Sequence, residues 1–166
     1  MIVLGIDPGI ANTGYGVVSS GGSRPQALGF GVIETRAAAP TAARLAEIHA
    51  DVGELIGRFA IDAVAVEDLY FGANVVSAMA VGQARGVVLL AAGQQGVPVH
   101  AYTPQQVKAA VCGSGRADKQ QVARMVARLL GMAAPPRPDH AADALAVALC
   151  ECNRAPLAGA IAEAVA

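Results

Sequence analysis

The sequence predicts an α/β protein whose five-stranded mixed sheet carries helices on both faces. Short apolar segments have the length and composition of buried strands, and three of them come first, before strands begin to alternate with helices. Glycine-rich turns join the first three segments, which favours an antiparallel meander. Helical crossovers make the later strands parallel to the first.

Five segments are expected to be strands, and the first ends at Pro8-Gly9, a strong turn signal. The second and third are separated by Gly21-Gly22. In chain order the strands are residues 1–7, 12–20, 27–35, 61–67 and 97–101.

Helical periodicity is clearest after Pro40-Thr41, where apolar residues recur at steps of three and four up to Phe59. Further helices are expected over residues 74–93, 104–111, 118–130 and 139–153. Residues 1–153 are predicted to form one domain. Residues 154–166 are predicted to be a C-terminal tail with a short helix begun by Pro156.

Composition narrows the class of protein. Apolar residues make up 54% of the 166 residues and charged residues 15%, which excludes a disordered chain. The net charge of −1 gives no bulk argument for nucleic acid or membrane. Gln83 and Arg85 interrupt the apolar stretch 75–93, so no membrane span is expected. The three cysteines suit free thiols in a reducing cytoplasm.

Two carboxylates close two of the apolar strands. Asp7 ends the first strand and Glu67 ends the fourth. If these strands are parallel neighbours, both carboxylates lie at the sheet edge where open α/β sheets bind ligands. The alternative is that Asp7 only begins the turn into Pro8-Gly9 and that Glu67 faces solvent.

The last helix supplies two more candidate ligands. His140 and Asp143 share one face of a helix that is otherwise almost entirely apolar. An ionised Asp143 in such a helix is costly unless it is paired or binds a metal, whereas Asp139 suits the helix N-terminus. Three carboxylates and one imidazole fit sites for hard cations such as Mg²⁺ or Mn²⁺.

Four blocks of sequence carry a resemblance to a known family. They are GIDPGIANTGYGVV, VEDLYFGANVVSAMAVGQARG, TPQQVKAAVCGSGRADKQQV and DHAADALAVA. In order and spacing they resemble the RuvC family of Holliday-junction resolvases, over nearly the whole of residues 1–153. The resemblance implies a ribonuclease-H-like fold and an endodeoxyribonuclease that resolves four-way DNA junctions in recombination and repair by paired symmetric nicks.

The resemblance also implies an active site with two divalent ions, Mg²⁺ or Mn²⁺, and products with 5′-phosphate and 3′-hydroxyl ends. The catalytic, metal-binding positions of the family fall on Asp7, Glu67, His140 and Asp143. The family often has an aspartate where this chain has His140. Because imidazole is a softer ligand than carboxylate, this difference favours Mn²⁺.

Local charge predicts where DNA binds. Both lysines of the chain, Lys108 and Lys119, lie with Arg116 around the glycine loop 113–115, where the backbone can approach phosphates. By resemblance, the two lysines match basic DNA-binding positions. Arg124 and Arg128, four residues apart, are interpreted as a solvated helix face.

Two adjacent aromatic residues, Tyr70 and Phe71, follow Glu67 closely. They suit stacking on unpaired bases or wedging at a branch point, and core packing is the alternative. In the family an aromatic residue of this loop acts as such a wedge.

A homodimer is expected because two matched cuts in a two-fold symmetric junction need two sites, and the family is dimeric. Ala78, Gly82 and Gly86 allow close packing of the helix 74–93, in the core or at a dimer contact. The RuvA and RuvB branch-migration proteins are partners implied by the resemblance.

Two other functions compete with the nuclease. A junction-binding module could keep the fold without the chemistry. The first block also resembles the phosphate loop of actin-like ATPases and sugar kinases, but those folds need two such domains around a cleft, more than 166 residues can supply.

Overall fold

The structure is a computed structural model that describes residues 1–68 and 75–165, with side chains at 1–68 and 78–154. Its five strands form one sheet in the order β3-β2-β1-β4-β5. They are β1 (Ile2–Asp7), β2 (Asn12–Ser19), β3 (Gln26–Glu34), β4 (Ala63–Glu67) and β5 (Val99–Tyr102). Strands β1, β2 and β3 pair antiparallel, and β1, β4 and β5 pair parallel. The predicted mixed sheet is confirmed.

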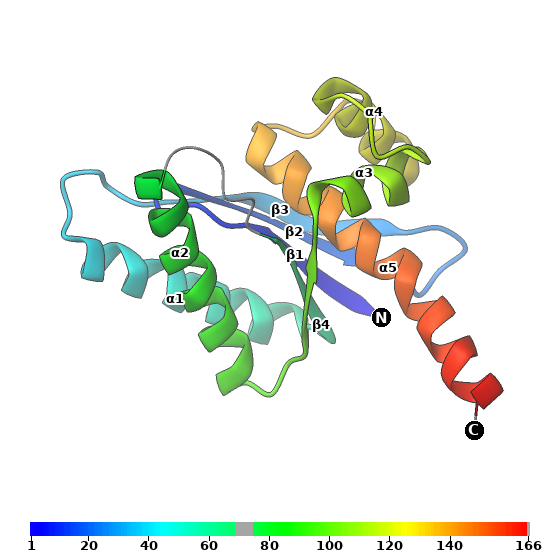
Figure 1. Ribbon diagram of the computed structural model, residues 1–166, viewed down its shortest axis with the longest axis horizontal. Helices are drawn as coiled ribbons and strands as arrows, with labels where there is room; N and C mark the ends of the chain where they lie inside the picture. Colours follow the sequence, from blue (N-terminus) through cyan, green and yellow to red (C-terminus); the bar gives the residue numbers. More distant parts are fainter. Residues whose placement is uncertain (69–74, 166) are drawn as a thin grey trace.

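Helices cover both faces of the sheet, as predicted. One face carries α1 (Thr41–Phe59) and α2 (Val75–Gln94), and the other carries α3 (Pro104–Cys112), α4 (Lys119–Leu130) and α5 (Asp139–Val165), as Figure 1 shows. None of the helices in the described residues has both the length and the apolar character needed to cross a bilayer.

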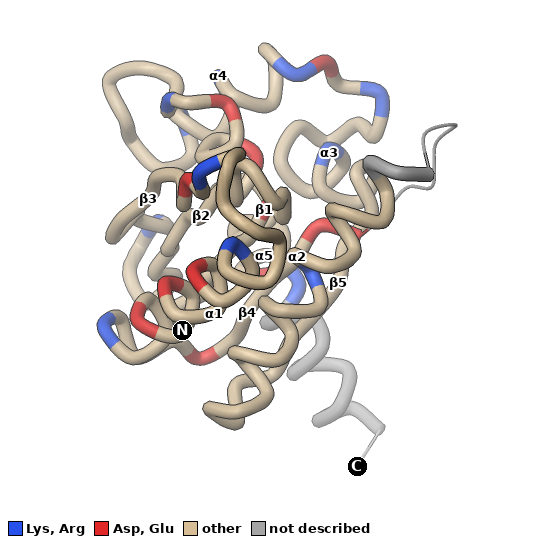
Figure 2. The backbone as a smooth tube through the Cα atoms, turned by 90° about the vertical axis from the view of Figure 1, so that its left-hand side faces the viewer, with Lys and Arg blue, Asp and Glu red and all other residues tan. Residues whose placement is uncertain are grey.

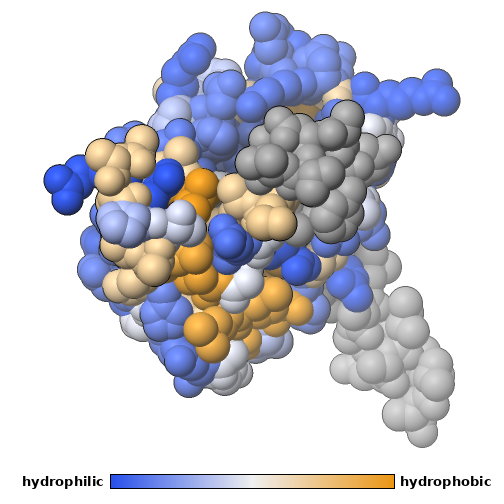
Figure 3. Space-filling model, turned by 60° about the vertical axis from the view of Figure 1, so that its left-hand side comes forward, coloured by the Kyte–Doolittle hydropathy of each residue, from blue (hydrophilic) through white to orange (hydrophobic). Residues whose placement is uncertain are grey.

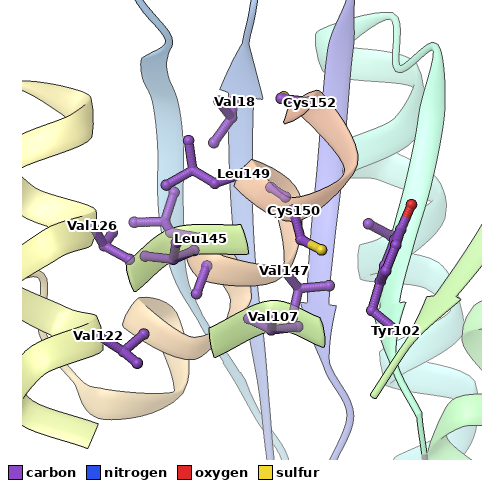
Figure 4. Packing of buried hydrophobic residues seen from close by; sticks show 14 of the residues in the cluster. Val18, Tyr102, Val107, Val122, Val126, Leu145, Val147, Leu149, Cys150 and Cys152 are labelled. Carbon is purple, nitrogen blue, oxygen red and sulfur yellow. The ribbon is translucent and has the colours of Figure 1, made fainter. Parts of the chain in front are cut away.

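Alternation along the central strand divides the core in two. Leu4 and Ile6 point to the layer of α1 and α2, whereas Val3 points to the layer of α3, α4 and α5. Figure 4 shows the second layer, where Leu145 and Leu149 of α5 lie among valines of α3 and α4. A side chain on β1 that alternates with Leu4 and Ile6 therefore faces α5.

Helix α5 lies unusually close to the sheet because glycines face it. A Cβ added at Gly5 of β1 would lie 2.0 Å from the Ala144 carbonyl oxygen, and one at Gly14 of β2 would lie 2.1 Å from the carbonyl oxygen of His140. Gly16 meets α5 in the same way at Leu145. The absence of three side chains thus sets the height of α5 above β1 and β2.

The end of α5 differs from the prediction. The helix does not stop near Asn153 but runs unbroken to Val165, with Pro156 inside it. Alanine-rich sequence on both sides of Pro156 favours helix and offsets the local loss of one backbone donor. At the other end Asp139 is the first helical residue, and the Pro138 carbonyl accepts from the backbone N–H of Ala141.

Capping boxes fix where α3 and α4 begin. Thr103 and Gln106 exchange hydrogen bonds at the start of α3, and Asp118 and Gln121 do the same at the start of α4. These caps determine the direction in which each helix leaves the loops that flank the sheet edge.

The edge strand β5 is anchored to α5 by a polar cluster. Glu151 is buried and accepts a hydrogen bond from the Tyr102 hydroxyl, while His100 Nδ1 lies 3.1 Å from the same carboxylate. Burial, and then the hydrogen bond to Glu151, raise the pKa of Tyr102 to about 12. The cluster holds the strand that leads into α3.

Because α5 lies so close to β1, one added methyl group at Gly5 should strongly lower the stability of the protein. Gly5→Ala forces α5 away from β1, and we expect it to lower the free energy of unfolding by about 3 kcal/mol in urea denaturation. Gly57→Ala, on the open side of α1, is the matched control. The free energy of unfolding of this control should rise by up to about 1 kcal/mol, because alanine has a higher helix propensity than glycine. Equal stability of the two variants would contradict the packing role of Gly5.

Candidate active site

Asp7 and Glu67 lie side by side at the carboxyl edge of the sheet. Asp7 follows Val3 and Gly5 on the α5 side of β1, and Glu67 follows Ala65 on the same side of β4. The parallel register pairs Ile6 with Val66, so that each carboxylate comes one residue after a matched pair. The strand ends thus bring together two residues that are distant in the sequence, as expected.

Helix α5 brings the other two predicted residues to this edge. The Nδ1 atom of His140 lies 2.7 Å from Oδ2 of Asp7. One potential ligand atom from each of Asp7, His140 and Asp143 lies within 4.8 Å of the others. Because Gly14 admits the backbone of His140, the height of α5 above the sheet directly determines these distances.

A network of hydrogen bonds fixes the turn after Asp7. The hydroxyl of Thr13, which is fully buried, donates to the Gly9 carbonyl oxygen over 2.6 Å. Arg44 of α1 donates to the Ile10 carbonyl oxygen at 3.1 Å and to the Thr35 hydroxyl at 2.8 Å. The turn that sets the end of β1 is therefore held from two sides.

Lys119 is the cation closest to the carboxylates. Its Nζ lies 3.0 Å from Asp143 and 3.4 Å from Asp139, which joins the start of α4 to the start of α5. Burial lowers the pKa of Lys119, but the hydrogen bond and charge of Asp143 outweigh this and raise it above the ordinary value. Lys119 thus stays protonated while it faces the site.

Glu67 lines a cavity of about 200 Å³ together with Asp143, Lys108 and Lys119. It lies outside the group of three ligand atoms but interacts with it electrostatically. Burial, followed by the charges of Asp7 and Asp143, raises the pKa of Glu67 to about 7. Burial also raises the pKa of Asp7, against the hydrogen bond from His140, which lowers it.

Negative charge at this edge is not fully balanced by the protein. After burial, the charge of Asp143 raises the pKa of Asp7, and the charges of Asp7 and Asp143 raise the pKa of Glu67, even though Lys108 and Lys119 lie nearby. A divalent cation would relieve this repulsion, because carboxylate oxygens are the ligands that hard cations prefer. The donor set, three carboxylates and one imidazole, therefore fits a metal centre.

The remaining predicted residues do not all meet at this centre. Arg116 lines a different cavity, with Arg124 and Arg128. Tyr70 and Phe71 lie outside the described residues.

Sequence reasoning missed Asp139 as a partner of Lys119, and it missed the role of Gly14 and Gly16. Two glycines at alternate positions of one strand are the available signal, since both must face the same side of the sheet.

Comparison with known proteins gives one consistent result. The family described as crossover junction endodeoxyribonuclease RuvC matches residues 3–151. The chain belongs to the RuvC family. The crossover junction endodeoxyribonuclease RuvC of Moorella thermoacetica is 53% identical over 156 residues, which cover 94% of this chain and 93% of that protein.

Solved structures of RuvC proteins have the same fold as this chain. The RuvC structure from Thermus thermophilus is 45% identical, has a TM-score of 0.90, and is matched over 95% of this chain and 97% of its own. The T. thermophilus RuvC in complex with Holliday junction substrate has a TM-score of 0.87 at 44% identity, with 95% of this chain and 96% of that chain covered. The ribonuclease-H-like fold expected from the sequence is thereby confirmed. RuvC membership also favours the nuclease over the kinase-like and non-catalytic alternatives.

The raised pKa of Glu67 predicts how stability depends on pH without metal. Between about pH 4.5 and 7 the folded protein binds more protons at Glu67 than the unfolded chain does, so its stability falls as the pH rises. Glu67→Gln removes this penalty. At pH 8 in EDTA, we expect the variant to be more stable than the wild type by up to about 3 kcal/mol.

Thermal unfolding across this pH range measures the effect. The gap between variant and wild type should close near pH 4.5, and Mg²⁺ or Mn²⁺ at pH 8 should stabilise only the wild type strongly. A gap independent of pH would show that folding does not raise the pKa of Glu67.

Proposed function

We propose that Asp7, Glu67, His140 and Asp143 form the catalytic centre with which this RuvC-family chain cuts four-way DNA junctions. The observation that carries the proposal is the convergence of Asp7, His140 and Asp143 within 4.8 Å, from β1 and α5. Glu67 adds a carboxylate from the neighbouring strand. These residues come from distant parts of the sequence, and the packing of α5 on the sheet brings them together.

We infer that the centre holds two divalent ions, Mg²⁺ or Mn²⁺. When bound, such ions activate a water molecule and stabilise the leaving 3′-oxygen of an in-line phosphodiester displacement. Asp7 lies at the end of the central strand between the residues of α5 and Glu67, so it suits the shared ligand. Asp143 and Glu67 then hold the two sides of the site.

His140 is suited to positioning and proton transfer. With a proton on Nδ1 the ring donates to Asp7, and Nε2 is left to bind a cation or to accept a proton. Its side chain is 46% exposed, so protons can exchange with solvent. An imidazole in place of a carboxylate lowers the negative charge of the site and favours Mn²⁺.

Two lysines bind the substrate phosphate in this proposal. Lys108 lines the cavity beside Glu67, and Lys119 projects from the first turn of α4. Each supplies a positive charge toward which a scissile phosphate is drawn. The products have 5′-phosphate and 3′-hydroxyl ends. RuvA and RuvB remain partners predicted from family resemblance, as does the wedge role of Tyr70 or Phe71.

Cleavage of a synthetic four-way junction tests this function. Wild-type protein in Mg²⁺ or Mn²⁺ should give symmetric nicks, and Asp7→Asn should lower the cleavage rate by about 100-fold or more because a metal ligand is lost. Junction binding should persist in the variant. Gel separation of end-labelled strands measures both the position and the rate of nicking.

Asp51→Asn is the matched control, since Asp51 lies on α1 in the opposite layer of the molecule. It should nick at the wild-type rate. The proposal is wrong if Asp7→Asn cuts as fast as Asp51→Asn, or if wild-type nicking persists in EDTA.

We also propose that two copies of the chain pair through α2, which provides the two sites that a symmetric junction requires. One face of α2 packs against the core through Ala84, Val88 and Ala91. The other exposes Met79, 63% accessible, and Leu90, 53% accessible. Figure 3, seen from the side of α2, shows hydrophobic residues gathered on this surface.

The exposed residues of α2 follow the spacing of a helix–helix contact. Met79, Gln83, Gly86, Leu90 and Gly93 are separated by four, three, four and three residues. A Cβ at Gly86 or Gly93 would meet nothing within 4 Å in the monomer, so a second helix can approach closely there. Of the predicted small residues, Gly86 lies on this exposed face, and Ala78 and Gly82 are half-buried.

A charge on this face should separate the two copies. We expect Leu90→Lys to convert a wild-type dimer into a monomer in sedimentation experiments, because a buried lysine at the helix contact has no partner. Leu28→Lys, an exposed leucine of β3 that is 44% accessible, should leave the dimer intact. A wild-type monomer, or a dimeric Leu90→Lys variant, would refute pairing through α2.

A further inference from the structure

Helix α4 carries two arginines that the catalytic centre does not use. Arg124 and Arg128 are both exposed, and the sequence alone favours a solvated helix face for them. In the structure they line hollows in the surface. Figure 2 shows lysines and arginines distributed along α3, α4 and the connections beside them.

The first hollow lies between the end of α3 and the body of α4. It has a volume of about 660 Å³, and its polar lining includes Ser114, Arg116, Arg124 and Arg128. Three guanidinium groups thus border one depression. The Ser114 hydroxyl accepts a hydrogen bond from the Arg116 backbone N–H, which orders the loop at its rim.

The second hollow joins this surface to the catalytic centre. Its volume is about 560 Å³, and its lining includes Arg124, Arg137, Lys119 and Asp143. Arg124 borders both hollows. The two hollows thus meet at Arg124, with Arg137 and Asp143 in one and Arg128 and Arg116 in the other.

The arginines that border the two hollows form no ion pairs within the described residues, although Asp139 and Asp143 also line the second hollow. No carboxylate among the described residues lies within ion-pair distance of Arg116, Arg124, Arg128 or Arg137. The nearby acids are occupied, since Asp118 caps α4 and Asp139 pairs with Lys119. Arg124 and Arg128 also repel each other as like charges four residues apart on one helix face. A polyanionic ligand would pair with the arginines and would also reduce the repulsion between Arg124 and Arg128.

We propose that these four arginines form a phosphate track that holds the backbone of one DNA strand after it leaves the catalytic centre. The proposal rests on the junction-cleaving function for the identity of its ligand. Guanidinium groups bind phosphates through paired N–H donors, and contacts to phosphates fix the register of DNA without reading its sequence. The phosphate track thus orients a junction arm relative to the cut.

The length of α4 sets how much DNA the track covers. Twelve residues span about 18 Å of helix. Phosphates of one strand follow one another at about 3.4 Å along the duplex axis, so a strand that runs along α4 would place about five of them beside the helix. The effect of the arginines should therefore be confined to a short run of phosphates on one side of the nick.

Salt-dependent junction binding tests the proposal, with Ca²⁺ in place of the catalytic metal. The double variant Arg124→Ala with Arg128→Ala should reduce the slope of log affinity against log salt by about two units, since each phosphate contact contributes about 0.9. Between 50 and 200 mM salt, the wild type should then lose about 10-fold more affinity than the double variant.

Arg58→Glu is the matched control. It removes the same two units of charge from the exposed end of α1, in the opposite layer of the molecule, and should leave the slope unchanged. If both variants lower the slope equally, net charge alone is responsible and the phosphate track is refuted.

Replacing single phosphates by uncharged methylphosphonates then shows which phosphates the arginines contact. Methylphosphonates placed one at a time beside the cleavage position should weaken wild-type binding at about five consecutive positions, and the double variant should lose this sensitivity at about two of them, the positions that face Arg124 and Arg128. Equal losses in both proteins would overturn the proposal. Nicking of the unmodified junction by the wild type in Mg²⁺ reports on the proposed function separately, so failure of the track is distinguishable from failure of that function.

Discussion

The close packing of α5 on β1 and β2 is the constraint on which the rest of this molecule depends. Three glycines leave room for the helix backbone, and side chains at these positions would collide with Ala144, His140 and Leu145. The same contact buries the apolar length of α5 and sets the distance between Asp7 and the residues of its first turns. Stability and the geometry of the site therefore depend on one helix–sheet interface.

At the proposed catalytic edge, groups that are each unfavourable when buried alone partly compensate one another. Burial, and then repulsion by Asp7 and Asp143, raise the pKa of Glu67 to about 7. Lys119 offsets part of this repulsion by joining Asp139 to Asp143, and cations offset the rest in the proposed mechanism. The protein thus carries a local cost in the metal-free state that metal binding removes, a usual property of sites built for strong ligands.

Charged residues are distributed unevenly over the surface, so different regions of the surface suit different kinds of contact. Positive residues cluster on α3, α4 and their connections although the chain as a whole carries a charge of −1. The opposite layer presents an apolar face of α2 instead. Pairing through α2 leaves the charged surface of each copy free to meet DNA, so the proposed dimer contact and the proposed phosphate track do not compete for the same residues.

The sequence by itself determined the order and type of the strands and helices up to Asn153, because apolar periodicity and turn residues are local signals, but it predicted a separate short helix where α5 continues through Pro156. It also indicated Asp7, Glu67, His140 and Asp143, since strand ends and a polar pair on an apolar helix stand out. Only the tertiary structure decided that Lys119 pairs with Asp143 and that Arg124 borders two hollows. These features depend on distances between segments far apart in the chain, which local patterns do not encode.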